Sequence, residues 1–191
     1  MPAERAYVPT MTSLAMTADE LLHTSIPNKR VELVKGHLIV REPPGGRHGG
    51  VLTNLAARLW NHVELTGAGQ VFSGDTGFAL AKSPDTVRGP DIAFVRRERL
   101  PQPVPTGYLT TAPDLVVEIL SPTDRPGEIL AKVGDWLEAG ARLVWVIDPE
   151  RRLARIYRHD GTETTQAEAE QLSGEDILPG FTCLLSAILL E

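Results

Sequence analysis

Polar and apolar residues near the start of the chain form two short periodic patterns. Thr17 and Glu20 have the spacing of a capping box, in which each side chain accepts a backbone N–H of the other residue, so a short helix is predicted there. Residues 30–34 and 37–41 alternate in polarity on either side of a short turn and predict a β-hairpin. Residues 1–16 show neither pattern, and we expect them to be loosely ordered.

Helical spacing dominates the next segment. Residues 42–50 are rich in glycine and proline and predict a loop. Apolar residues then recur at helical spacing from Val51 to about Leu65, and Gly67 follows as a helix terminator. This long helix is expected to pack on a sheet, and strand patterns come next at 70–73, 77–82 and 91–95.

The second half of the chain has the order strand, helix, strand. A proline-rich loop at 100–113 comes first and is expected to run along the active face. A strand at 114–120, a helix at 127–139 and a strand at 143–147 follow it. A βαβ unit over 114–147 makes its two strands parallel and places the helix on one face of the sheet. A turn, a final strand pair and an apolar C-terminal segment follow. Residues 17–191 are therefore expected to form a single domain with a mixed α/β fold.

Composition sets limits on the class of protein. The chain has 191 residues, of which 42% are hydrophobic and 23% charged, as in one globular domain. The net charge of −6 argues against a protein that coats nucleic acid without specificity, so any phosphate contact must be local. The single cysteine, Cys183, excludes an intramolecular disulfide. The sequence shows no signal-peptide pattern and no apolar run of about 20 residues, so a cytoplasmic protein that does not enter the membrane is expected.

Two short apolar runs each contain one carboxylate. In the run GPDIAFV, Asp91 follows the Gly-Pro pair and precedes the apolar residues. In the run LVVEILS, Glu118 lies between apolar residues. A carboxylate in a buried strand must be paired, hydrogen-bonded or bound to a metal, because desolvation of a lone charge is prohibitively costly. Two such groups on separate strands can converge on one cation, so the two runs indicate a metal site.

A second Pro-Asp pair makes Asp114 a competing ligand. Asp114 and Glu118 would share one strand face, but they would stand about 13 Å apart at about 3.3 Å per residue, too far to bind one ion. Asp91 is therefore the preferred ligand. Asp114 is expected to cap the entrance of its strand or to meet solvent.

The spacing from Pro90-Asp91 to Glu118 matches that of the PD-(D/E)XK nucleases, and further segments extend the likeness. These segments, in chain order, are Glu32 in VELVKGHLIV, His48 before the long helix, GPDIAFV, APDLVVEILSPTD, Lys132 and GARLVWVIDP. Together they resemble the Uma family (Uma-two) of small bacterial proteins over residues 15–190. The resemblance implies a restriction-endonuclease-like core, with a mixed β-sheet flanked by helices, and a DNA endonuclease.

One position departs from the superfamily pattern. Leu120 stands where the signature has a lysine, and the resemblance implies that Lys132 supplies this lysine from the helix. Its place at the edge of the apolar helix face lets its side chain cross toward Glu118. The alternative is an ordinary lysine whose stem covers apolar side chains. The segment 121–124 is expected to cap this helix and so to fix the lysine.

The donor types indicate which metal would bind. Hard carboxylate oxygens without a histidine or cysteine cluster favour Mg²⁺, or Mn²⁺, over Zn²⁺. We expect Asp91, Glu118 and the backbone carbonyl of Ile119 to hold the ion. Such an ion would neutralise phosphate charge and activate a water, with Lys132 stabilising the developing charge. The predicted reaction is phosphodiester hydrolysis.

Glu32 and His48 each have two interpretations. Glu32 is a further catalytic carboxylate, in the metal shell or at a second ion as the family pattern suggests, or an exposed hairpin residue. His48 lines the cleft and touches substrate or the metal-bound water, as the resemblance implies, or it is a structural histidine or part of a flexible glycine-rich loop. The sequence has no Lys-Ser/Thr after these glycines, no nucleophile elbow and no dinucleotide fingerprint, which removes support for a Walker loop, a serine hydrolase or an oxidoreductase.

Two classes of function remain open. The first is a Mg²⁺-dependent endonuclease acting on DNA, which the acid, acid and lysine set favours. The second is a non-catalytic nucleic-acid or protein interaction module that retains the nuclease fold, since a fold does not establish an activity. The acidic charge and short chain leave sequence specificity weak or dependent on a partner. A homodimer is compatible with the resemblance, because cutting both strands often uses two copies.

Overall fold

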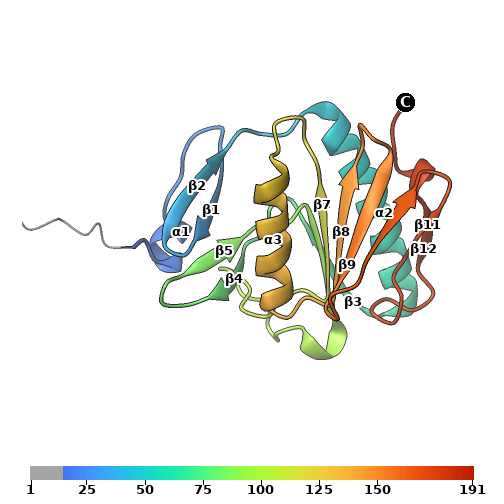
Figure 1. Cartoon of the computed structure of the whole chain (residues 1–191). Coiled ribbons are helices and arrows are strands. Elements are labelled where there is room, and N and C mark those ends of the chain that lie inside the picture. Colours follow the sequence, from blue (N-terminus) through green and yellow to red (C-terminus); the bar gives the residue numbers. More distant parts are fainter. Residues whose placement is uncertain (1–14) are drawn as a thin grey trace, which may run out of the picture.

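The computed structural model describes residues 15–191, which form a central sheet, a smaller sheet beside it and helices that cover them (Figure 1). In chain order the elements are α1 (Ala18–Leu22), β1 (Arg30–Val34), β2 (His37–Arg41), α2 (Gly46–Thr66), β3 (Gly69–Ser73), β4 (Phe78–Ala81), β5 (Thr86–Arg88), β6 (Ile92–Arg96), η1 (Arg97–Arg99), β7 (Leu115–Ile119), α3 (Pro126–Glu138), β8 (Leu143–Asp148), β9 (Leu153–Arg158), β10 (Glu163–Ala167), β11 (Gln171–Ser173), β12 (Thr182–Leu184) and η2 (Leu185–Ala187). The expectation of loose order for 1–16 lies outside the described residues except at Ala15 and Met16, and Met16 donates its N–H to the carbonyl of Gly36.

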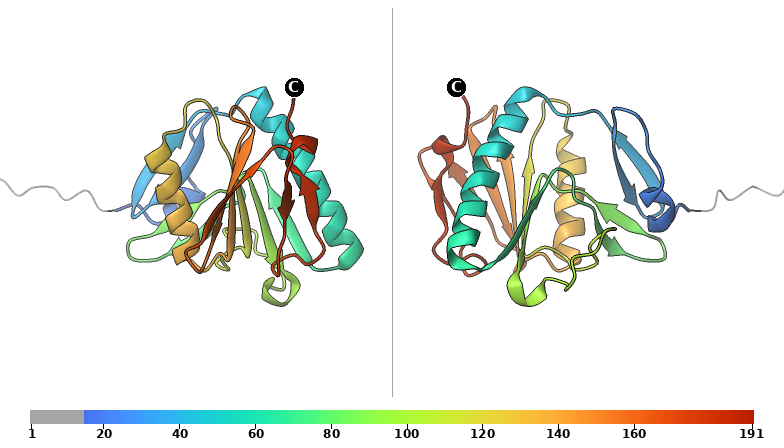
Figure 2. Two further views of the ribbon diagram at one scale, coloured as in Figure 1. Left: turned by 45° about the vertical axis from the view of Figure 1, so that its right-hand side comes forward. Right: turned by 180° about the vertical axis from the view of Figure 1, so that it is seen from behind.

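The central sheet has six strands in the order β10-β9-β8-β7-β6-β3. β7 and β8 are parallel, and the other neighbours are antiparallel. Helix α3 connects the parallel pair and covers one face of the sheet, whereas α2 crosses the opposite face (Figure 1, Figure 2). The mixed sheet flanked by helices and the βαβ unit agree with the sequence prediction.

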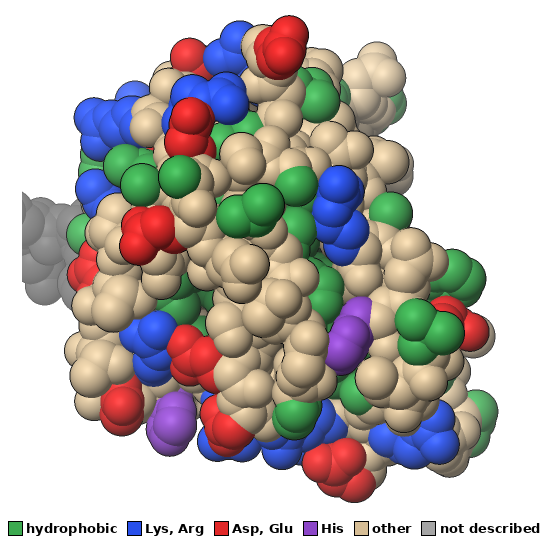
Figure 3. All heavy atoms as spheres, turned by 90° about the vertical axis from the view of Figure 1, so that its right-hand side faces the viewer, with side chains coloured by type: hydrophobic (Ala, Val, Ile, Leu, Met, Phe, Trp, Pro, Cys, Tyr) green, Lys and Arg blue, Asp and Glu red, His purple; other side chains and the backbone are tan. Residues whose placement is uncertain are grey.

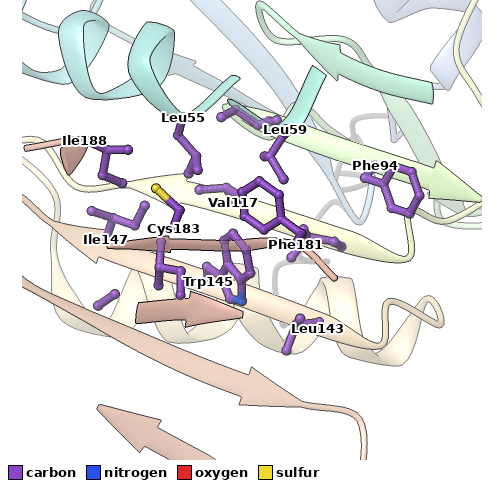
Figure 4. Packing of buried hydrophobic residues seen from close by; sticks show 14 of the residues in the cluster. Leu55, Leu59, Phe94, Val117, Leu143, Trp145, Ile147, Phe181, Cys183 and Ile188 are labelled. Atoms are coloured by element: carbon purple, nitrogen blue, oxygen red, sulfur yellow. The ribbon is translucent and has the colours of Figure 1, made fainter. Parts of the chain in front are cut away.

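Successive residues of the central strands point to opposite faces and build two cores. On the α2 side, Val117 and Trp145 pack with Leu55 of the helix and with Phe181 of the C-terminal segment (Figure 4). On the α3 side, the intervening strand residues pack with Trp136 of that helix. Because the middle strands are buried on both faces, they are nearly continuous apolar runs, and a carboxylate within one of them must have buried partners.

The smaller sheet has the order β2-β1-β5-β4, and α1 packs on it. Leu21 of α1, Leu33 of β1 and Val87 of β5 form a separate small core. The β1-β2 hairpin and the capping box of α1 are confirmed. Strand β5 is absent from the sequence prediction, because it is only three residues long and depends on its pairing with β1 and β4.

Helix α2 starts at Gly46, so the predicted loop is wrong for residues 46–50. Glycine disfavours helix in isolation, but tertiary packing outweighs this preference here. Gly50 lies against Leu190, where a Cβ would stand 2.4 Å from the Cδ1 atom. Gly67 ends the helix as predicted, with the left-handed φ of 62° that suits glycine.

Two further predictions need correction. The N-cap of α3 is Arg125, which makes no side-chain capping hydrogen bond, so the segment 121–124 does not cap this helix. Asp124 instead accepts the N–H of Ser121 and closes a turn that precedes helix α3. The final strand pair is β9-β10 as expected, but a short pair, β11-β12, follows it and places Leu172 opposite Cys183. Within residues 15–191, no helix is long and apolar enough to cross a membrane.

The packing predicts a sharp contrast between two leucines of α2. Leu55 is fully buried, whereas Leu65 is 88% exposed. We expect Leu55→Ala to lower the free energy of unfolding by about 2–5 kcal/mol through lost burial and a residual cavity. The matched control Leu65→Ala should change it by no more than about 0.5 kcal/mol. Urea unfolding of both variants measures the difference, and equal effects would contradict this placement of α2.

Candidate active site

The strand register brings Asp91 and Glu118 together. β6 runs antiparallel to β7, and the last pair in their register is Ile92 opposite Val117. Asp91 directly precedes Ile92 and Glu118 directly follows Val117, so the two acids lie at the same end of this strand pair. Asp91 is 3% and Glu118 4% exposed, so both carboxylates are buried.

Glu118 points to the α3 side of the sheet and is held by two residues of that helix. Its Oε2 accepts from Lys132 Nζ at 2.9 Å, and its Oε1 accepts from Trp136 Nε1 at 2.8 Å. Burial raises the pKa of Glu118 to about 7, with Lys132 opposing the rise and Asp91 adding to it. The geometry therefore fixes both oxygens of this carboxylate.

Lys132 crosses from α3 into the site, as its position at the edge of the helix face indicates. Its Nζ donates to Glu118 and, at 3.0 Å, to the carbonyl of Gly89, and it lies 3.1 Å from Glu32 Oε1. Three acceptors match the three hydrogens of an ammonium group. Although burial favours the neutral amine, Glu118 and Glu32 raise the pKa of Lys132, so the lysine stays charged.

Glu32 is 7% exposed, so the interpretation as an exposed hairpin residue is wrong. Its Oε2 accepts from Arg88 Nη1 at 3.0 Å, and its Oε1 accepts the N–H of Gly89 at 3.0 Å. Arg88 also donates through Nε to Asp135 of α3 at 2.9 Å. Although burial opposes ionisation, Lys132 and Arg88 lower the pKa of Glu32, which is therefore an anion joining the small sheet to α3.

Asp91 is bonded differently through its two oxygens. Oδ2 accepts the backbone N–H of Ile119 at 2.7 Å, which ties the carboxylate to the end of β7. Oδ1 lies 3.1 Å from Nε2 of His48 and 3.3 Å from Nη2 of Arg30. Burial opposes ionisation, but the contacts with His48 and Ile119 lower the pKa of Asp91. Oδ1 is consequently the oxygen whose partners are side chains.

His48 lies in the first turn of α2 and is only 5% exposed. The interpretation as part of a flexible loop is therefore wrong, and helix packing places its ring beside Asp91. Among residues 15–191, its Nδ1 has no hydrogen-bond partner. His48 is thus a buried neighbour of one carboxylate of the site.

Asp114 lies at the other end of β7 from Glu118 and takes no part in this cluster. It is 1% exposed, so the expectation that it meets solvent is wrong. Its Oδ2 accepts the N–H of Arg96 at 2.9 Å, and its Oδ1 accepts from Arg99 Nη1 at 2.6 Å. Asp114 thus accepts one backbone N–H and one arginine side chain at the start of β7, which agrees with a capping role.

The cluster lies in a cleft of about 530 Å³ between the β1-β2 hairpin, the start of α2 and the start of α3. Lining residues from these elements and from the strand ends include Arg30, Glu32, His48, Asp91, Glu118 and Lys132. The proline-rich loop at 100–113 is not part of the lining, so the expectation that it runs along the active face is wrong. Leu109 of that loop instead bridges to Phe78 and is buried in the core under α3.

Charged side chains of both signs are mixed on one face of the molecule. Figure 3 shows the face that carries the C-terminal strands, where Lys and Arg side chains are interspersed with Asp and Glu. The whole chain has a net charge of −6. A polyanion is therefore expected to make local contacts with this protein, as the composition already indicates.

The carboxylates can be tested as a metal site by their chemistry. Among residues 15–191, no group of three or more His, Cys, Asp or Glu is arranged to hold a metal ion. Zn²⁺ usually needs at least three protein ligands, whereas Mg²⁺ is commonly bound by one or two carboxylates with waters. Asp91 and Glu118, which line one cleft, fit the second kind of site.

Comparison with known proteins identifies the family. Residues 18–187 match the family Uma2, described as "Putative restriction endonuclease". The chain belongs to the Uma2 family. A solved structure, described as "a putative nuclease belonging to DUF820 from Anabaena variabilis", resembles it with a TM-score of 0.80 at 19% sequence identity, and the match covers 91% of this chain and 97% of that one. This likeness shows the shared fold.

Among curated proteins there is no match. Uma2 membership supports a nuclease, and hence a hydrolase acting on nucleic acid.

Sequence reasoning missed three residues that complete the cluster. Arg88 precedes the Gly-Pro-Asp motif directly and forms buried ion pairs with Glu32 and with α3. Trp136 follows Lys132 by one helical turn, and its indole N–H reaches the same carboxylate. Arg30, at the start of β1, reaches Asp91. Their positions beside recognised site residues are the signal that could have identified them.

The two buried tryptophans predict different costs for the same substitution. Trp136 and Trp145 are both fully buried, but Trp136 Nε1 donates to Glu118, whereas Trp145 Nε1 has no partner within residues 15–191. We expect Trp136→Phe to destabilise the protein by about 1.5–3 kcal/mol more than Trp145→Phe, the value of a hydrogen bond to a charged group. Urea unfolding of the pair tests this, and an equal or smaller cost for Trp136→Phe would contradict it.

Proposed function

We propose that this Uma2 protein is a Mg²⁺-dependent endonuclease that hydrolyses phosphodiester bonds of DNA. The observation that carries the proposal is the cleft lined by Asp91 and Glu118, with the Lys132 ammonium bonded to Glu118. Acidic residues and a lysine in such a cluster match the chemistry that phosphoryl transfer needs, which is charge neutralisation and positioning.

We propose that Asp91 and Glu118 hold the ion, together with the backbone carbonyl of Ile119. Ile119 is next to Glu118 and already bonds Asp91 through its N–H, so the three groups are adjacent. A divalent cation bound there would neutralise phosphate charge and lower the pKa of a coordinated water. Mn²⁺ shares this preference for oxygen ligands and is the expected substitute.

Lys132 serves this site by holding the carboxylates in place and by supplying positive charge. It is bonded to Glu118 and to the carbonyl of Gly89, two residues before Asp91. Its ammonium is thus fixed beside both strands, and its positive charge would act on a phosphate in the cleft without a direct bond to it. Glu32 keeps the lysine charged and oriented, and we propose that it contributes to catalysis in this way.

Cleavage assays with three site variants and one control test the proposal. Asp91→Asn, Glu118→Gln and Lys132→Met should each lower plasmid cleavage in Mg²⁺ by about 100-fold or more, because each removes a charge that acts on the transition state. Asp114→Asn is the matched control, since Asp114 is also a buried aspartate after a proline. It should retain cleavage once folding is confirmed by circular dichroism. Equal losses in all four variants would attribute the effect to folding and contradict the assignment.

Metal binding can be measured without any reaction. A ligand that binds only the folded state stabilises it by about 2.7 kcal/mol at a concentration 100 times its Kd. We therefore expect Mg²⁺ to raise the Tm of the wild type and of Asp114→Asn, and not that of Asp91→Asn. Calorimetric titration should give the same order. Wild-type DNA binding without cleavage would favour the non-catalytic interaction module, and absence of metal binding would overturn the metal site.

A further inference from the structure

The cations of the site differ in how they are engaged. Lys132 has an acceptor for each of its three hydrogens, and its side chain is 11% exposed. Arg88 bridges Glu32 and Asp135, and its side chain is 6% exposed. Both are therefore committed to carboxylates within the protein. Neither can turn toward a ligand without leaving a buried acid unpaired, which would be costly.

Arg30 is engaged in another way. Its side chain is 24% exposed and lines the cleft. Its Nη2 pairs with Asp75 and lies 3.3 Å from Asp91 Oδ1, a distance longer than a typical hydrogen bond. Among residues 15–191, Nε and Nη1 of Arg30 have no hydrogen-bond acceptor. The guanidinium therefore keeps donors for a ligand in the cleft.

Other arginines of the cleft lie at its rim. Arg41 donates to Glu128 at 3.2 Å, and Arg125 is 83% exposed with its nearest carboxylate, also Glu128, at 3.9 Å. Neither contacts Asp91 or Glu118 in the described structure. Arg30 is thus the arginine placed beside the carboxylate pair. A guanidinium is suited to oxyanions because its planar fork presents parallel donors to two oxygens.

We propose that Arg30 binds a phosphate group of the nucleic-acid strand in the cleft, exchanging its long contact with Asp91 for phosphate oxygens. This inference rests on the nuclease function proposed above and adds the residue that holds the substrate. Asp91 would no longer need Arg30 as a counter-ion once a divalent cation is bound. Asp75 also lines the cleft and pairs with Nη2 of Arg30, so it competes with a phosphate for the guanidinium.

The proposal predicts that Arg30→Gln weakens the binding of DNA but not the binding of Mg²⁺. Affinity for a fluorescein-labelled duplex oligonucleotide, measured by anisotropy with Ca²⁺ in place of Mg²⁺ and with the DNA shown intact on a gel, should fall about 10-fold or more. The slope of log affinity against log salt should become shallower by about 0.9, the value for one lost phosphate contact. Affinity for Mg²⁺ alone, by calorimetry, should be unchanged or tighter, because a positive charge beside Asp91 has been removed.

Three further variants separate substrate binding from structure. Arg30→Lys keeps the charge and loses the fork, so it should retain the salt slope with intermediate affinity. Asp75→Asn removes the partner that competes for Arg30, so it should bind the oligonucleotide as tightly as the wild type or more tightly. Arg142→Gln removes an arginine paired with Asp176 outside the cleft, and it should leave binding unchanged.

The outcomes distinguish this inference from the function on which it rests. If the wild type binds Mg²⁺ and cleaves DNA while Arg30→Gln binds the oligonucleotide equally well, the role of Arg30 is overturned and the nuclease stands. If Asp75→Asn weakens DNA binding as much as Arg30→Gln, or if Arg30→Gln loses Mg²⁺ binding, the arginine acts as a structural counter-ion and the inference is overturned. If the wild type binds no DNA, both proposals are overturned.

Discussion

The buried ammonium of Lys132 is the interaction on which the arrangement of this protein's cleft depends. It brings a carboxylate of the central sheet, a carboxylate of the small sheet and the carbonyl of Gly89 to one point. Each of these groups would be costly to bury alone. Removing the lysine would leave two buried anions facing each other, so helix α3 and both sheets must keep this geometry together.

A second set of ion pairs also holds the small sheet to helix α3. Arg88 of the small sheet joins Glu32 of its own sheet to Asp135 of α3. The small sheet is attached to the rest by these polar bonds and by Phe78 of β4, which is buried in the core under α3. Buried ion pairs add little net stability over apolar packing, but they define one geometry because the alternatives leave charges unpaired. The cleft between the hairpin and α3 is therefore preorganised.

Preorganisation is also what a nuclease of this kind requires. Phosphoryl transfer gains most from charges that are fixed before the reaction, because no reorganisation is then needed as charge develops. Glu118 has both oxygens held and Asp91 has one, which leaves Asp91 Oδ1 as the more adaptable atom, shared between His48 and Arg30. Uma2 membership agrees with this interpretation. The net charge of −6 favours a local contact with nucleic acid over an extended one.

The sequence by itself determined the first β-hairpin and the βαβ unit, because these follow from local periodicity. The mixed sheet flanked by helices followed from the resemblance to the Uma family. It also placed Lys132 at the edge of its helix face. Only the tertiary structure decided the start of α2, the existence of β5 and the burial of Glu32, since each depends on contacts between segments far apart in the chain. The contacts of Arg30 and Arg88 were likewise decided only by the tertiary structure. An arginine has the same local signature whether it is solvated or bridges buried acids, and only its neighbours in space decide between the two.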